Sequence, residues 1–150
     1  MRVSSRAIII KDDKVALIYR EGKNGKYYVF PGGGQEIGET KEDCVIRECF
    51  EELGITVSVI KQLYEVKGDN VYQNFYLCNW ESGEFGTGDG EEYNEENKSE
   101  LYEPIFVKIS EIKDLNIISP EIKNQFLIDY KIFKNQMDNN IKNIYEKGLI

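Results

Sequence analysis

The sequence predicts an α+β fold in which a mixed β-sheet is flanked by helices. Runs rich in Val, Ile and Tyr alternate with only a few helical patterns along the chain. No internal repeat or linker divides the 150 residues, so we expect a single domain over residues 1–150. The hydrophobic content of 41% is enough for a core and argues against disorder over most of the chain.

The first elements expected are three strands. Val3–Lys11 and Val15–Arg20 are apolar runs separated by a short charged turn, which is typical of a β-hairpin. Tyr27–Phe30 is a third, shorter run, and Pro31 with three glycines ends it. A glycine-rich turn then leads towards a helix.

The first helix is expected from Thr40 to about Leu53. Thr40 is suited to be the N-cap of a capping box, with Asp43 three residues later. Gly54 is suited to end the helix in a left-handed conformation.

The second half of the chain is expected to hold further strands and a last helix. Ile55–Val66 and Asn70–Trp80 are predicted strands, and Glu81–Glu103 is a long polar loop. After the loop, Ile105–Lys108 is a short predicted strand.

A helical turn is expected at Ser110–Leu115, followed by the last helix. Ser119 as N-cap and Pro120 at the first helical position open that helix, which is expected to run to about Tyr145.

Charge and composition exclude several classes of function. The net charge of −8 and the absence of a visible basic patch argue against a nucleic-acid polymer as partner. No run approaches the roughly 18 apolar residues of a membrane span, and the N-terminus fits a strand better than a signal peptide. We therefore expect a cytoplasmic protein without a membrane partner.

Cysteine and histidine usage narrows the chemistry further. The odd number of cysteines without a CxxC pattern indicates buried thiols in a reducing compartment. The chain has no histidine, which excludes Ser-His-Asp triads and His-ligated zinc. Any chemistry must therefore use carboxylates, hydroxyls, lysine, arginine, or a hard cation bound through oxygen.

Three glutamates share one face of the expected helix near its end. On a helical wheel, Glu52 and Glu51 lie within about 60° of Glu48. The side chains expected to face the core form the opposite arc. They are Ile46, Cys49, Phe50 and Leu53.

This arrangement of glutamates is costly for a merely solvated acidic face. Like charges at these spacings cost roughly 0.2–0.5 kcal/mol per pair, and the negative end of the helix dipole opposes each by about 0.3–1 kcal/mol. We therefore expect Glu52→Gln to stabilise the cation-free protein by about 0.5–1.5 kcal/mol. A bound divalent cation would convert the repulsion into binding.

The residues before the helix sharpen this interpretation. The segment 30–40, FPGGGQEIGET, is a glycine-rich connection whose backbone can approach a ligand closely. It lacks the Lys-Ser/Thr ending of a P-loop.

Together these residues resemble the Nudix box. Gly33 is followed after five residues by Glu39 and, after seven more, by the run REcfEElGI from Arg47 to Ile55. Every charged and glycine position of the box matches, and Cys49 occupies a position where the family has a bulky apolar residue.

The resemblance implies a Nudix αβα sandwich and hydrolysis of a diphosphate linkage in a nucleoside diphosphate derivative, with Mg²⁺ or Mn²⁺. It implies metal ligands on the helix and a further ligand in the carbonyl of Gly32. The implied helix ligands are Glu48, Glu51 and Glu52. Arg47 is then the residue that orients the glutamates, and Glu39 helps to hold the loop.

The family often has one more acidic residue, acting as base or ligand, on a loop before a late strand. The polar loop offers several glutamates, and the spacing to Phe106 favours Glu100, with Glu103 as the alternative. The expected catalytic residues are therefore Glu48, Arg47, Glu39 and Glu100.

The residues that would indicate the substrate are less specific than the Nudix box itself. No proline lies near positions 69–70, where ADP-ribose hydrolases often have one. Tyr72 has a spacing reminiscent of dinucleoside polyphosphate hydrolases, but sheet packing explains it as well. Arg20, Lys23 and Lys26 could steer phosphates or simply be surface charge.

Two alternatives remain open beside the hydrolase. One is a non-catalytic Nudix-like module that binds a nucleotide derivative as a sensor. The other is an acidic interaction domain, for which no motif speaks. A small-molecule partner and a monomer or homodimer are expected in the leading interpretation.

Overall fold

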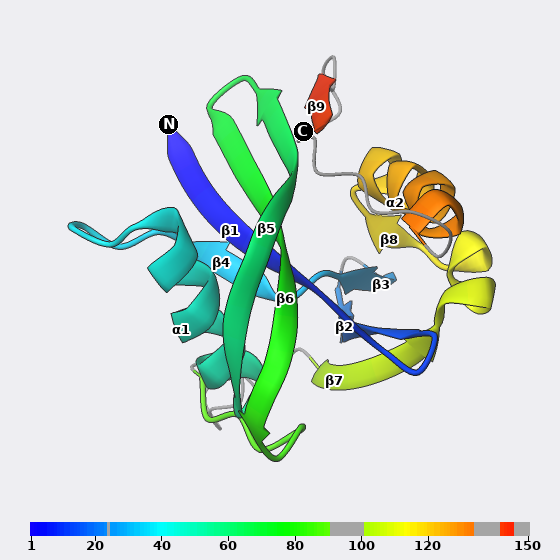
Figure 1. Ribbon diagram of the computed structural model, residues 1–150, viewed down its shortest axis with the longest axis horizontal. Helices are drawn as coiled ribbons and strands as arrows, with labels where there is room; N and C mark the ends of the chain where they lie inside the picture. Colours follow the sequence, from blue (N-terminus) through cyan, green and yellow to red (C-terminus); the bar gives the residue numbers. More distant parts are fainter. Residues whose placement is uncertain (24, 91–100, 134–141, 146–150) are drawn as a thin grey trace.

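The computed structural model describes residues 1–23, 25–90, 101–133 and 142–145 (Figure 1). The elements in chain order are β1 (Arg2–Lys11), β2 (Lys14–Gly22), β3 (Gly25–Val29), β4 (Gly32–Gly34), α1 (Lys41–Leu53), β5 (Ile55–Gly68), β6 (Val71–Gly83), β7 (Leu101–Lys108), the short 3-10 helix η3 (Ile109–Asp114), β8 (Ile117–Ile118), α2 (Pro120–Phe133) and β9 (Lys142–Tyr145).

The strands form one mixed, curled sheet in which β1 is the central strand. The order along the sheet is β8-β3-β2-β1-β6-β5-β9, with β4 paired to β1 and β7 paired to β2. β1 runs parallel to β6 and antiparallel to β2 and β4. The predicted α+β fold with a mixed sheet is confirmed.

The two helices cover opposite faces of β1. Successive side chains of a strand point to opposite faces. Ile8 belongs to the core cluster that contains Phe126 of α2, whereas Ala7 and Ile9 belong to the cluster that contains Val45 of α1. Figure 1 shows α1 and α2 on opposite sides of the sheet accordingly.

The local signals at the hairpin and at the first helix are confirmed. Asp12 and Asp13 have φ values of 54° and 60°, which suit the tight turn between β1 and β2. The Asp43 N–H donates to Thr40 Oγ1 over 3.0 Å, and Gly54 ends α1 with φ of 77°. The cap residues therefore place both ends of α1 as the sequence predicts.

Phe50 does not face the core, contrary to the prediction. Its exposed fraction is 57%, whereas Cys49 and Leu53 are fully buried. Glu52 is buried as well, with an exposed fraction of 7%. The buried arc of α1 is therefore rotated towards the glutamates, because the glycine strand β4 packs against that side.

The second half of the chain contains more strand than predicted. Glu81–Gly83 continue β6, and Leu101–Glu103 begin β7, which pairs with β2 along its whole length. Ladder hydrogen bonds satisfy these backbones in spite of their polar side chains. Residues 91–100 of the predicted loop lie outside the described residues.

The last helix is shorter than predicted. α2 begins at Pro120 as expected, but the described helix ends at Phe133. Lys142–Tyr145, predicted to be helical, form β9 and pair in parallel with β5. Helical propensity is a weak determinant here, because pairing with the edge of the sheet satisfies the same backbone groups.

The three cysteines are buried and unoxidised, as predicted. Burial raises the pKa of Cys78 to about 12, so this side chain stays a neutral thiol. Within the part of the chain that the structure describes, no helix has the length and apolar character needed to cross a bilayer.

Candidate active site

The glycine strand β4 brings the chain against the acidic face of α1. Gly33 pairs with Ser5 of β1, and a Cβ added at Gly33 would lie 2.4 Å from a carboxylate oxygen of Glu48. Only a glycine leaves room for that carboxylate. The sequence predicted a glycine-rich turn here, whereas Gly32–Gly34 form a short strand paired with β1.

Glu52 is anchored below this strand. Its Oε1 accepts a hydrogen bond of 2.7 Å from the backbone N–H of Gly32. The partly buried guanidinium of Arg6 is electrostatically coupled to Glu52, which counters the lowering of the Arg6 pKa by desolvation. Replacing Glu52 by Gln would remove the charge that compensates Arg6, so we now expect Glu52→Gln to lower the stability, in contrast to the gain expected from the helix alone.

Arg47 connects the remaining carboxylates, and we call Arg47 with Glu39, Glu48 and Glu51 the Arg47 cluster. Arg47 Nε and Nη2 donate hydrogen bonds to the two carboxylate oxygens of Glu39, over 2.7 and 3.1 Å. Its Nη1 lies 3.2 Å from Glu48 Oε1 and 3.1 Å from Glu51 Oε2. One side chain thus holds three carboxylates that would otherwise repel one another.

The electrostatics of the Arg47 cluster follow from these bonds. The hydrogen bonds with Glu39 are the largest cause that raises the pKa of Arg47, and the same bonds lower the pKa of Glu39. Arg47 also donates to the carbonyl of Gly34 over 3.0 Å. It therefore joins the helix to both ends of the glycine-rich connection.

The negative end of α1 is covered by backbone donors. The N–H groups of Gly86 and Gly90 donate to the carbonyls of Leu53 and Glu51, each over 2.9 Å. Gly88 lies so close that an added Cβ would be 2.4 Å from the carbonyl oxygen of Glu52. These donors reduce the dipole penalty that the sequence predicts for the glutamates.

Two cavities meet at Glu48. The acidic cavity, of about 470 Å³, is lined by Gly34, Glu36, Arg47, Glu48, Glu51, Asp89 and Gly90. The arginine cavity, of about 250 Å³, is lined by Arg2, Arg6, Arg20, Val29, Gly32, Gly33, Gly34, Glu48, Glu52 and Tyr102. The acidic cavity has four carboxylate residues beside one arginine, whereas the arginine cavity has three arginines beside Glu48 and Glu52.

Sequence reasoning missed part of this lining. Arg2 and Arg6 lie four residues apart on β1, a spacing that places both on one face of a strand, and this signal was available. Arg20 was considered for phosphate steering, and its guanidinium lies 4.4 Å from the ring centre of Tyr102. Asp89 was not singled out among the many acidic residues of the polar loop.

Of the remaining acidic and tyrosine candidates, only Glu103 and Tyr72 can be placed relative to the cavities. Glu100 lies outside the described residues. Glu103 is an exposed residue of β7 opposite Tyr19 and lines neither cavity, whereas its neighbour Tyr102 does. Tyr72 contacts Lys41 and Glu65, which fits a role in sheet packing.

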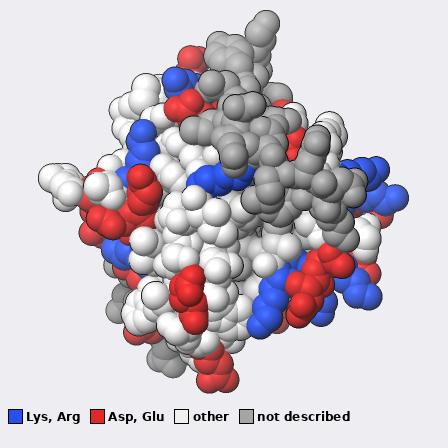
Figure 2. Space-filling view, viewed as in Figure 1, with Lys and Arg blue, Asp and Glu red and all other residues white. Residues whose placement is uncertain are grey.

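The side chains that line the acidic cavity are of the kind that binds a hard cation. Its acidic lining residues offer only oxygen ligands, as Mg²⁺ prefers, and they are Glu36, Glu48, Glu51 and Asp89. In the described residues no three acidic or cysteine side chains already converge as a metal site. Glu48 and Glu51 line this cavity and also accept hydrogen bonds from Arg47 Nη1, so a bound cation would share these carboxylates with Arg47. Figure 2 shows acidic side chains gathered beside α1, at the left of the view.

Substitutions of Gly33 and of its neighbour Gly34 test whether the position of the Glu48 carboxylate matters. In Gly33→Ala the new methyl group must displace the Glu48 carboxylate, whereas Gly34→Ala meets only Arg2 Nε at 4.0 Å. We expect Gly33→Ala to lower kcat at least tenfold, with a melting temperature close to that of Gly34→Ala. Equal kcat values for the two variants in a steady-state assay would show that the position of Glu48 is unimportant.

Comparison with known proteins agrees with this geometry. The model of the NUDIX domain family matches residues 1–126. A nudix hydrolase of Caenorhabditis elegans is 38% identical over 88 residues, covering 54% of this chain and 24% of that protein. An ADP-ribose pyrophosphatase of Methanocaldococcus jannaschii is 43% identical over 58 residues, covering 38% of this chain and 34% of that protein. The matches thus span about a quarter to a third of these relatives' lengths.

Solved structures show the same fold at low sequence identity. An ADP-ribose pyrophosphatase of Streptococcus suis superposes with a TM-score of 0.66 at 17% identity, covering 97% of this chain and 98% of that one. A UDP-X diphosphatase superposes with a TM-score of 0.69 at 19% identity, covering 94% of this chain and 66% of that one.

Proposed function

Because the chain belongs to the Nudix family, we propose that it hydrolyses a diphosphate linkage in a nucleoside diphosphate derivative, with Mg²⁺ or Mn²⁺ as cofactor. The chemistry is the breaking of a phosphoric anhydride bond by water. A bound divalent cation would neutralise the diphosphate and supply a hydroxide near neutral pH.

The observation that carries the proposal is the meeting of the two cavities at Glu48. The acidic cavity offers carboxylate oxygens for a cation, and the arginine cavity offers guanidinium groups for phosphate oxygens. A diphosphate bound across this boundary would contact both. Positioning and charge stabilisation are what phosphoryl transfer to water chiefly requires.

Individual residues take separate roles in this proposal. Glu48, Glu51 and Glu52 hold the metal together with the carbonyl of Gly32. Glu51 lines the acidic cavity, Glu52 and Gly32 line the arginine cavity and Glu48 lines both, so the proposed metal site lies at the boundary between the two cavities. Arg47 is a positioning residue, because its donors reach three carboxylates at once.

Two further acidic residues complete the proposed machinery. Glu39 fixes Arg47 through two hydrogen bonds and so acts on the site indirectly. Glu100 remains our proposed base or additional ligand. Asp89, which lines the acidic cavity, is the described residue that competes with Glu100 for this role.

The names of the relatives make ADP-ribose the first substrate to test. Two of the similar proteins are ADP-ribose pyrophosphatases, although one match is short and the other has low identity. Asp69 and Asn70 occupy the positions where a proline would have favoured ADP-ribose. The substrate class is therefore better supported than the group attached to the diphosphate.

A substrate panel tests the proposal. Nucleoside triphosphates, ADP-ribose, sugar nucleotides and dinucleoside polyphosphates are incubated with Mg²⁺, with Mn²⁺ or with excess chelator, and the products are separated by chromatography. We expect cleavage between two phosphorus atoms in at least one class, abolished by chelator. Full activity in chelator would contradict the metal requirement, and tight binding of a compound without cleavage would favour the sensor module.

A further inference from the structure

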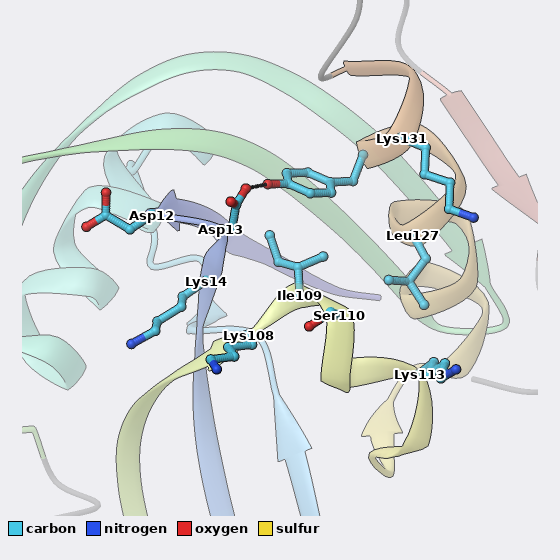
Figure 3. A pocket seen from close by; sticks show the side chains of 10 residues that line it. Asp12, Asp13, Lys14, Lys108, Ile109, Ser110, Lys113, Leu127 and Lys131 are labelled. Atoms are coloured by element: carbon cyan, nitrogen blue, oxygen red, sulfur yellow. Dashed lines mark hydrogen bonds between the residues drawn. The ribbon is translucent and has the colours of Figure 1, made fainter.

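A third cavity lies away from the glutamates of α1, and we call it the lysine pocket. It has a volume of about 740 Å³ and lies between the β1–β2 turn, the start of η3 and the C-terminal half of α2 (Figure 3). It shares no lining residue with the acidic or the arginine cavity. Its volume falls within the range of roughly 300–1,000 Å³ that is typical of small-ligand sites.

The pocket has an apolar wall that neighbouring elements hold in place. Ile109 is almost fully buried, and partly buried Leu127 and Tyr130 lie across from it. The Tyr130 hydroxyl donates to the carboxylate of Asp13, and the Ile109 N–H donates to the Asp13 carbonyl over 2.9 Å. Asp13 thus joins both α2 and η3 to the β1–β2 turn, and these hydrogen bonds fix the positions of the pocket walls relative to one another.

Lysines from four different elements line the same pocket. They are Lys14 of β2, Lys108 of β7, Lys113 of η3 and Lys131 of α2. Two aspartates also line it: the Asp13 carboxylate accepts the Tyr130 hydroxyl, and the Asp12 carboxylate points away from the apolar wall in Figure 3. A gathering of lysines is notable in a chain of net charge −8. Figure 2 shows basic side chains on either side of acidic ones at the lower right, over the β1–β2 turn.

Two of these lysines are direct cross-strand neighbours. Lys14 is the register partner of Lys108, and Lys14 also pairs with Lys11 across the hairpin. Like charges directly opposite each other destabilise a sheet. An anion bound between Lys14 and Lys108 would convert this repulsion into charge-assisted hydrogen bonds.

From these observations we propose that the lysine pocket binds a nucleoside monophosphate, at a site separate from the active site. The phosphate lies between Lys14 and Lys108, and the base packs against Ile109, Leu127 and Tyr130. The apolar wall is short and partly aromatic, which suits a flat base better than a long acyl chain. The proposal concerns binding alone and does not rest on the proposed hydrolysis.

AMP is the probe for this site, with amide chemical shifts measured by NMR in excess chelator. We expect saturable shifts at Ile109, Leu127 and Tyr130. The double variant Lys14→Gln/Lys108→Gln should raise the Kd of AMP at least tenfold, while Lys67→Gln, an exposed residue outside the pocket, leaves it unchanged. Inorganic phosphate should bind at least tenfold more weakly than AMP, because it leaves the apolar wall uncovered.

Several results would overturn the proposal. Shifts confined to α1 and β4 would place AMP in the arginine cavity instead. The same Kd in the double variant and the wild type, or no saturable shifts at millimolar AMP, would exclude the site. Equal affinity for phosphate and AMP would exclude a role for the apolar wall. The double variant should be at least as stable as the wild type, since it removes a repulsion, so loss of folding does not confuse the test.

Discussion

Glu51→Gln and Glu52→Gln are each expected to lower turnover by about 100-fold or more. Each replaces a proposed metal-binding carboxylate by a neutral amide of nearly the same shape. Loss of one preorganised group that stabilises transition-state charge typically costs about 10²–10³ in kcat. The measurement is steady-state kinetics on the best substrate of the panel, with circular dichroism to confirm the fold.

Glu42→Gln is the matched control for these variants. Glu42 is an exposed residue in the first turn of the same helix and lines neither cavity. It should retain activity within about twofold. A similar loss in all three variants would point to a general effect of charge on the helix and would remove the carboxylates from the mechanism.

The two active-site variants should differ in stability. Glu51 is 41% exposed at its side chain and contacts Arg47, so its loss costs little. Glu52 is buried beside Arg6, and we expect Glu52→Gln to lower the free energy of unfolding in chelator by about 1–3 kcal/mol. Urea unfolding in chelator measures this difference.

Arg47→Met is expected to have the largest effect on stability, lowering the free energy of unfolding by about 2–4 kcal/mol. The side chains of Glu39 and Glu48 are only 13% and 14% exposed, and the substitution leaves both without this cation. The side chain of Arg47 is itself 24% exposed. We therefore expect a smaller loss of free energy than the largest values found when a fully buried ion pair is broken. Turnover should fall as well, since the carboxylates lose their common orienting group.

The pH dependence of this loss distinguishes the ion pair from simple packing. Arg47 lowers the pKa of Glu39 in the folded protein below its ordinary value of 4.5. The stabilisation is therefore fully present above that value and is lost as the pH falls through the lowered pKa. Urea unfolding at pH 7 and at several values below 4.5 should show the difference between wild type and Arg47→Met shrinking with acid.

Two further variants complete this test. Arg47→Lys should lose part of the stability, because an ammonium group cannot form the two parallel bonds to Glu39. Glu39→Gln added to Arg47→Met should restore part of it by removing an uncompensated charge. A pH-independent loss with no rescue would instead assign Arg47 a packing role.

Local signals in the sequence were sufficient to place helix α1, but not the glycine strand β4 beside it. Thr40 and Gly54 cap the two ends of α1 as predicted. Capping depends on hydrogen bonds between residues that are only a few positions apart in the sequence. Phe50 was placed wrongly, because a helical wheel shows which residues share a face but not which face another element covers. The strand β9 was missed for a related reason, since its partner β5 is far away in sequence.

By itself, the sequence identified the family, and it predicted the carboxylate-based chemistry and the orienting role of Arg47, because these inferences use residues within one contiguous box. Only the tertiary structure decided that Glu52 is buried, that Arg2, Arg6 and Arg20 line a cavity beside Glu48, and that Lys14 opposes Lys108. The physical reason is that each of these depends on pairing between distant segments. Arg2 reaches its place through the parallel pairing of β1 with β6, and Lys14 meets Lys108 through the pairing of β2 with β7. Such registers are set by the packing of both sheet faces and cannot be derived from the spacing of residues along one segment.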